Sequence, residues 1–138
     1  MSKLYPFEVH TPYRLFYSDM IEAVTITLID GEIGVYADHS FFTAPVCAGI
    51  LKIKDKKGRW NHAFTTEGFL EVKAHKTVLL VDAAEWPHEI DYGRALEAKK
   101  HAQEQIASGT FRFEIGAAQT TLRRAEFRLK VHALKEKA

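Results

Sequence analysis

The hydrophobic pattern of the chain changes period near residue 90. Upstream, apolar and polar residues alternate in short runs, and downstream apolar residues recur at intervals of three and four. Alternation with a period of two is typical of β-strands with one buried face, whereas the longer intervals are typical of amphipathic helices. The 138 residues are enough for one domain of ordinary size with an appendage. The pattern therefore predicts a β-rich part, residues 1–87, followed by a helical part, residues 88–138.

The N-terminal part contains runs of strand length that are separated by turn signals. Runs at residues 24–28, 60–64 and 69–72 alternate with turn sequences such as DGEIG, DKKGR and TTEG. Their spacing of roughly 8–12 residues is typical of a β-sandwich or barrel of short antiparallel strands, and we expect at least about seven strands. The continuous apolar run TVLLVDAA predicts a strand that is buried on both faces, and Pro87 ends the sandwich.

Beyond residue 90 the spacing predicts two helices that form an antiparallel hairpin. Asp91 can cap the first helix, and Gly109 stands where that helix should end. The connection SGTFRF is short, so the second helix should return along the first. The expected inward positions are Ala95, Ala98, Ala102 and Ile106 in the first helix and Ile115, Ala118, Leu122, Ala125, Leu129 and His132 in the second.

Alanine dominates the predicted contact between the two helices. Burial of a methyl-sized side chain contributes on the order of 1 kcal/mol, whereas burial of a leucine contributes about 1.5–3 kcal/mol. Such a contact offers little against the entropy that each ordered residue loses. We therefore expect the hairpin to be able to leave its docked position.

Charge is distributed unevenly along the chain. The net formal charge of +1 argues against nucleic acid as a partner. Residues 1–90 hold 9 Lys and Arg against 12 Asp and Glu, which gives −3, and residues 91–138 hold 10 against 6, which gives +4. A solvated helical surface explains such a basic segment without any partner, and an acidic or phosphate-bearing partner is the alternative explanation.

The residue types that would support other functions are sparse. Cys47 is the single cysteine, which excludes an intrachain disulfide and any site built from several cysteines. The histidines show no metal-ligand spacing, and Asp38 beside His39 has no convincing third group for catalysis. The N-terminus does not resemble a signal peptide, and no run of about 18 apolar residues occurs. We expect a cytosolic or peripheral protein with no catalytic and no metal site.

Five segments follow one another in an order that resembles the epsilon subunit of the bacterial F-type ATP synthase. They are FEVHTPYRLFYSDMIEAVTI, GEIGVYADHS, GFLEV, VLLVDAAE and IDYGRA. The resemblance extends over residues 7–129. It implies an N-terminal β-sandwich, a C-terminal pair of α-helices and a non-catalytic place on the central rotor stalk.

The resemblance also implies a set of partners. The sandwich would bind the gamma subunit and the ring of membrane c subunits, with contacts at Glu32, Gly34 and His39. It would thus couple rotation to the flow of protons or sodium ions, as a peripheral protein at the cytoplasmic face of the cell membrane that touches the membrane only through the c-ring. The extended hairpin would inhibit ATP hydrolysis at the catalytic beta and alpha subunits. The expected contacts with beta are Arg123, Arg124, Arg128 and Lys130.

Members of this family also carry a nucleotide site, marked by the pattern Ile/Leu-Asp-x-x-Arg-Ala. The matching residues here are Glu85, Ile90, Asp91, Arg94, Ala95, Arg124 and Arg128. The resemblance implies no required cofactor, but ATP as a regulatory ligand of the folded hairpin. Guanidinium groups from two helices can neutralise one triphosphate only while the helices are packed together. An ordinary capped helix start is the alternative explanation of the motif, and a stand-alone ATP-sensing module is the alternative function.

Two turns depart from the sequences that are usual in the family. The chain reads ADHSF at residues 37–41 where Pro-Gly-His-Ala-Pro is usual, and TEGF at residues 66–69 where Ser-Gly-Gly-Phe is usual. We expect both turns to persist with altered geometry.

Overall fold

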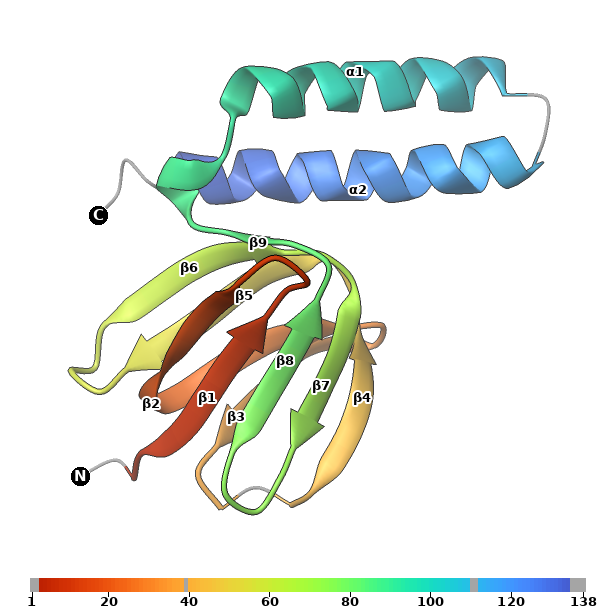
Figure 1. Ribbon diagram of the computed structural model, residues 1–138. Coiled ribbons are helices and arrows are strands. Elements are labelled where there is room, and N and C mark those ends of the chain that lie inside the picture. Colours follow the sequence, from red (N-terminus) through yellow and green to blue (C-terminus); the bar gives the residue numbers. More distant parts are fainter. Residues whose placement is uncertain (1–2, 39, 110–111, 135–138) are drawn as a thin grey trace. The chain divides into compact units, whose positions relative to one another are not determined.

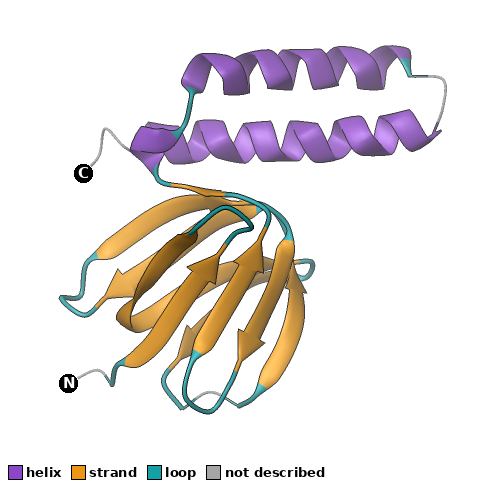
Figure 2. Ribbon diagram, viewed as in Figure 1, coloured by secondary structure: helices purple, strands orange, loops and turns teal. Residues whose placement is uncertain are grey.

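The computed structural model describes residues 3–38, 40–109 and 112–134 and forms two compact units, Met1–Glu85 and Trp86–Ala138. The first unit is built of strands and the second of helices (Figures 1 and 2). The expected fold, a β-sandwich followed by an antiparallel helical hairpin, is confirmed. The division into a β-rich part, residues 1–87, and a helical part, residues 88–138, stays a prediction.

The described residues of the first unit contain nine strands, more than the minimum of about seven that the sequence predicts. They are β1 (Tyr5–His10), β2 (Leu15–Leu28), β3 (Gly31–Tyr36), β4 (Phe42–Val46), β5 (Gly49–Asp55), β6 (Trp60–Thr65), β7 (Gly68–Val72), β8 (Thr77–Val81) and β9 (Ala84–Glu85). Their hydrogen-bonded order is β4-β7-β8-β1-β2-β5-β6-β9, and β3 pairs with β2. The strands pair antiparallel except for β1 and β8, which are parallel. Alternation along single strands contains no information on that one parallel pair, because it joins strands at opposite ends of the unit.

Strand β2 is shared by the two layers of the sandwich. Its residues 15–21 pair with β1, and its residues 21–28 pair with β3 and β5. The register against β5 shifts between Ile21 and Ala23, so Glu22 is an extra residue of the kind that bends a strand at a β-bulge. Beyond the bulge, Ala23 and Val24 are buried in succession, which marks the change in the face that β2 turns to the core. One long bent strand therefore closes the sandwich (Figure 1).

The core of the first unit is formed by alternate residues of these strands. Its largest fully buried side chains are Phe7, Phe64, Ile21, Leu51, Ile53, Leu70 and Leu79. The prediction that β8 is buried on both faces is wrong at Leu80, which is 41% exposed, although Val78 on the same face is buried. Phe69 of the neighbouring strand β7 pairs with Leu80, and Phe69 is exposed as well. The outer face of this layer is therefore apolar and accessible.

Both unusual turns have a specific backbone requirement. Asp38 has a φ of 67°, in the left-handed region that glycine adopts most readily and aspartate tolerates better than most residues. Its carboxylate accepts a hydrogen bond from the Lys3 ammonium at 2.9 Å. In the other turn, a Cβ on Gly68 would lie 1.9 Å from the carbonyl oxygen of Leu80, so only glycine lets β7 approach β8 this closely.

The second unit consists of a short 3-10 helix, η1 (Pro87–Glu89), and the helices α1 (Tyr92–Ser108) and α2 (Arg112–Leu134). The expected inward positions are buried or half-buried, and four alanines are the best buried of them: Ala95, Ala102, Ala118 and Ala125 are at most 4% exposed, whereas Ala98 is half-buried. The spacing missed Val131, which is fully buried although it lies outside the predicted stripe. Alanines thus supply four of the best-buried side chains at this contact, while Ile106, Ile115, Leu122 and Leu129 are half-buried around them.

Gly109 follows α1 as expected, but not because it ends the helix in a left-handed conformation. Its φ is −65°, so it does not form a left-handed cap. A Cβ at this position would lie 2.6 Å from Cγ1 of Ile115 and 2.9 Å from the carbonyl oxygen of Gln105. Glycine is therefore needed because α2 begins close to the end of α1.

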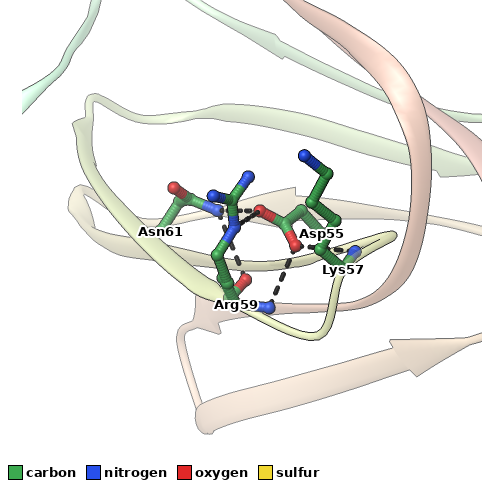
Figure 3. A network of polar contacts seen from close by, with 4 residues as sticks. All are labelled: Asp55, Lys57, Arg59 and Asn61. Carbon is green, nitrogen blue, oxygen red and sulfur yellow. Dashed lines mark hydrogen bonds and ion pairs between the residues drawn. The ribbon is translucent and has the colours of Figure 1, made fainter.

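The turn between β5 and β6 is organised by the carboxylate of Asp55 (Figure 3). Oδ1 accepts hydrogen bonds from the backbone N–H groups of Lys57 and Arg59, both at 2.9 Å. Oδ2 accepts from Nδ2 of Asn61 at 3.1 Å and from Nε of Arg59 at 3.2 Å. These bonds, led by the backbone N–H of Arg59, lower the pKa of Asp55 to about 2, because they favour the charged form.

In Asp55→Asn, the free energy of unfolding of the sandwich should fall less steeply with decreasing pH than in the parent. The folded pKa is depressed from its ordinary value of 3.8 to about 2. The stabilisation is therefore complete above the ordinary value and is lost as the pH falls through about 2. Denaturant unfolding between pH 5 and about 2 should show a shallower decline for Asp55→Asn than for the parent. Asp30→Asn, in the turn after β2, serves as control; equal slopes for the parent and Asp55→Asn would contradict the role of Asp55.

Candidate functional site

The start of α1 contains most of the residues that match the nucleotide motif. Asp91 is the N-cap of α1, and its Oδ1 accepts a hydrogen bond of 3.1 Å from the backbone N–H of Arg94. Ile90 and Ala95 are buried, whereas Asp91 and Arg94 are exposed. Asp91 thus has the capping role that any helix start could give it. Of this group, the guanidinium of Arg94 is the side chain best suited to an anionic ligand.

The four basic residues expected to contact beta divide into two sets on α2. Successive residues of an α-helix are about 100° apart, so Arg123 and Lys130 lie within about 20° of each other. Arg124 and Arg128 lie within about 40° of each other on a different face. Arg123 and Lys130 are exposed, and Arg124 and Arg128 are half-buried. The two sets can therefore serve different ligands.

Helix geometry places three arginines on one side of the hairpin. Arg94 and Arg124 each precede a buried alanine, Ala95 and Ala125, by one residue. The Cα–Cβ bonds of both arginines thus point about 100° away from the helix–helix contact, in the same rotational sense. For two antiparallel right-handed helices that face each other, an equal sense of rotation means the same side of the contact. Arg128, three residues after Ala125, is offset by about 60° toward that side as well.

The three arginines also lie at similar levels along the hairpin. The rings of Tyr92 and His132 are 5.1 Å apart, which sets the start of α1 against the end of α2. With a rise of about 1.5 Å per residue, Arg94 lies about 3 Å from this ring pair, Arg128 about 6 Å and Arg124 about 12 Å. Long side chains can bridge the remaining span of about 9 Å. Glu85, the other residue of the motif, belongs to the first unit. It lies in β9 and pairs with Phe64 of β6.

The residues expected to contact gamma and the c-ring lie on β3 and after it. The carboxylate of Glu32 is 3.3 Å from the Lys52 ammonium. Gly34 lies beside the ring of Tyr36, because a Cβ on Gly34 would be 3.1 Å from its Cε2. Tyr36 is 61% exposed, so it belongs to the same surface although the motif did not single it out. His39 lies outside the described residues.

The outer face of strands β4, β7 and β8 carries an apolar groove that the sequence analysis did not predict. Pro45, Phe69 and Leu80 are neighbours across β4, β7 and β8, and Phe69 and Leu80 are 56% and 41% exposed. With Pro12 they line a hollow of about 720 Å³, which we call the apolar groove. Alternation could have indicated it, since Phe69 and Leu80 are out of phase with their buried neighbours Leu70 and Leu79. A continuous exposed apolar surface of this kind marks an interaction site.

The tip of the β1–β2 hairpin borders the apolar groove. Tyr13 at this tip is 90% exposed. Oγ1 of Thr11 accepts hydrogen bonds from the backbone N–H groups of Tyr13, at 3.2 Å, and Arg14, at 3.1 Å. Thr11 and Pro12 line the groove itself. The backbone of the tip is therefore held in place beside the groove, and it carries the exposed Tyr13 next to the lining residue Pro12.

Two kinds of feature are absent from the described part of the chain. No three His, Cys, Asp or Glu side chains there form a group that could hold a metal ion. Within the same residues, no helix is long and apolar enough to cross a membrane.

Comparison with protein families assigns both units. Residues 5–87 match the model of the ATP synthase delta/epsilon chain, beta-sandwich domain, and residues 88–132 match that of its long alpha-helix domain. The ATP synthase epsilon chain of Caldanaerobacter subterraneus subsp. tengcongensis is 43% identical over 132 residues, which cover 95% of each chain. That of Caldicellulosiruptor saccharolyticus is 42% identical over 124 residues, which cover 90% of each chain.

Solved structures share the fold at lower identity. A chain of the Euglena gracilis mitochondrial ATP synthase matches 92% of this chain and 79% of its own length, with a TM-score of 0.79 and 19% identity. A chain from the central stalk and c-ring of the Tetrahymena thermophila mitochondrial ATP synthase matches 95% of this chain and 98% of its own length, with a TM-score of 0.66 and 15% identity.

Proposed function

The chain belongs to the ATP synthase delta/epsilon family, and from this membership we propose that it is the non-catalytic central-stalk subunit of an F-type ATP synthase. The observation that carries the proposal is that epsilon chains match it over 95% of both lengths, across both units. A stand-alone ATP-sensing module would need no groove for a protein partner. The parent complex would move protons or sodium ions, with this subunit peripheral at the cytoplasmic face of the cell membrane.

The apolar groove is the proposed surface for the gamma subunit. It combines exposed apolar side chains with the nearby exposed Tyr13, and aromatic residues are enriched among those that dominate interface energies. The c-ring contact would use the separate surface of Glu32, Gly34 and Tyr36 with His39. Two distinct surfaces suit a subunit that must transmit force between two neighbours.

The helical unit is the proposed inhibitor of ATP hydrolysis, and ATP is its proposed regulatory ligand. Arg94, Arg124 and Arg128 flank one side of the folded hairpin, where they could neutralise one triphosphate. ATP at a hundredfold excess over its Kd would favour the folded form by about 2.7 kcal/mol. A contact lined by alanine is weak enough for this energy to decide between the folded and extended forms.

The division of the basic residues suggests how the two ligands would compete. Arg124 and Arg128 would bind ATP in the folded hairpin and acidic segments of beta in the extended one. Arg123 and Lys130, which are exposed in the folded hairpin, would contact beta alone. Bound ATP would thus keep Arg124 and Arg128 from contacting beta, and it would also favour the folded hairpin over the extended, inhibitory one.

Phe69→Ser combined with Leu80→Ser should weaken binding of the isolated chain to the gamma subunit by about tenfold or more, because both side chains leave the apolar groove. Both are already exposed, so the core should remain intact. Ile29→Ser removes an equally apolar side chain, 84% exposed, at another turn and serves as control. Equal gamma affinity of the parent and the double variant, measured by calorimetry, would exclude the groove as the gamma surface.

Arg94→Ala and Arg128→Ala should each weaken ATP binding by about tenfold or more, since each removes a charge-assisted hydrogen-bond donor. Arg123→Ala carries the same change on the other face of α2 and should leave the affinity unchanged. Calorimetric titration of the three variants with ATP measures the effect. An equal loss in all three would indicate non-specific charge attraction, and no loss in any would reduce Asp91 and Arg94 to an ordinary helix start.

A further inference from the structure

The N-terminal segment that precedes β1 reaches the turn after β3. Nζ of Lys3 donates hydrogen bonds to both carboxylate oxygens of Asp38, at 3.0 Å to Oδ1 and 2.9 Å to Oδ2. Asp38 has a φ of 67°, a left-handed conformation that costs free energy for a residue with a Cβ. A change of φ would swing the carboxylate away from the ammonium, so the two bonds favour this conformation. Lys3 thus holds the residue at which the chain turns.

A second bond from the same segment holds the strand just before this turn. The phenol of Tyr5 donates a hydrogen bond to the backbone carbonyl oxygen of Val35. The two residues belong to strands that both pair with β2, β1 with its first half and β3 with its second half. Among the described strands, β3 pairs with β2 alone. The bond from Tyr5 therefore supports the end of a strand that has backbone pairing on one edge.

The residues held in this way border an exposed aromatic surface. Tyr36, the last residue of β3, is exposed, and Phe41, directly before β4, is 71% exposed. Both line a hollow of about 510 Å³. Tyr36 also lines a second hollow of about 270 Å³, and Lys3 and Asp38 line both hollows. The Lys3–Asp38 pair therefore borders both concave parts of this surface.

We propose that Lys3 and Tyr5 are positioning residues, which hold the end of β3 and the start of its turn so that Tyr36 meets a partner in one arrangement. Phe41, across the larger hollow, is then a further contact residue of the same surface. A surface that is ordered before binding loses less entropy when its partner binds. The restraint is a property of this chain alone; its use in contact with the c-ring rests on the proposed function.

The exposure of the Lys3–Asp38 pair separates a local effect from a global one. The two side chains are 69% and 73% exposed, and exposed ion pairs contribute little to global stability. Removal of the pair should therefore leave the midpoint of unfolding nearly unchanged while the turn loses order. Salt at about 1 M reduces the screening length to about 3 Å, so the turn of the parent should also lose order in high salt.

Backbone order parameters from nitrogen relaxation of the full chain test the restraint. Lys3→Ala should lower the values at residues 36–38 from about 0.85, which is typical of rigid backbone, to about 0.6. Asp38→Gly should do the same, although glycine adopts the left-handed conformation without strain. Lys3→Arg keeps a cation that can bind both carboxylate oxygens and should retain the values of the parent. Lys56→Ala, which removes another exposed and ion-paired lysine, serves as control.

Tyr5→Phe tests the second bond separately. It keeps the ring and removes only the hydroxyl that donates to Val35. The order parameters at residues 35 and 36 should therefore fall, while the ion pair of Lys3 with Asp38 should remain.

The consequence for the partner is measured with the c-ring. A preassembled pair of the full chain and gamma should bind the purified c-ring about fivefold or more weakly when the chain carries Lys3→Ala, because the surface must then be ordered on binding. Lys56→Ala should leave this affinity unchanged.

Three results would overturn the proposal. Unchanged order parameters in both Lys3→Ala and Tyr5→Phe would show that the N-terminal segment does not restrain the turn. An equal fall across all strands would show that these residues support the sandwich as a whole. Equal c-ring affinity of the parent and of Lys3→Ala, with the turn loosened, would exclude a role in binding. Failure of the proposed function is distinct from these, because it would appear as absent c-ring binding in the parent.

Discussion

Strand β2 has to serve both layers of the sandwich, and the rest of the first unit depends on this constraint. The bulge at Glu22 bends the strand so that one half pairs with β1 and the other with β3 and β5. In the layer that contains β1, Phe69 and Leu80 lie on the outer face. Its hairpin tip also reaches the carbonyl of Ala84 through Arg14. The hairpin that begins β2 thus both lines the groove and contacts β9.

The helical unit depends on a different compromise. Alanines at the contact let α1 and α2 approach closely, but they bury little apolar surface. The same small residues decide where the charged ones point, because Arg94 and Arg124 each stand directly before a buried alanine. A contact that is close in space and weak in energy, with arginines along one side, is suited to control by an anionic ligand. Stronger packing would make the hairpin insensitive to such a ligand.

The sequence predicted the features that local rules determine. The change of period, the cap at Asp91 and the buried alanines follow from spacing and side-chain chemistry, and the structure confirms them. Features that depend on pairing between distant segments could not be predicted from the sequence. The parallel pair of β1 and β8 and the hydrogen bond of Arg14 join residues about 70 positions apart. Leu80 was misjudged because a continuous apolar run does not distinguish a doubly buried strand from one that faces a partner.

The central claim is that the helical unit restrains ATP hydrolysis while the sandwich alone maintains the connection to the rotor. The most direct test is ATP hydrolysis by a complex reconstituted with the full chain and with the chain lacking residues 88–138, across a range of ATP concentrations. The account predicts faster hydrolysis without the helices, with the largest difference at low ATP and with unchanged incorporation of the subunit. Identical rates at every ATP concentration, with both forms equally incorporated, would contradict it.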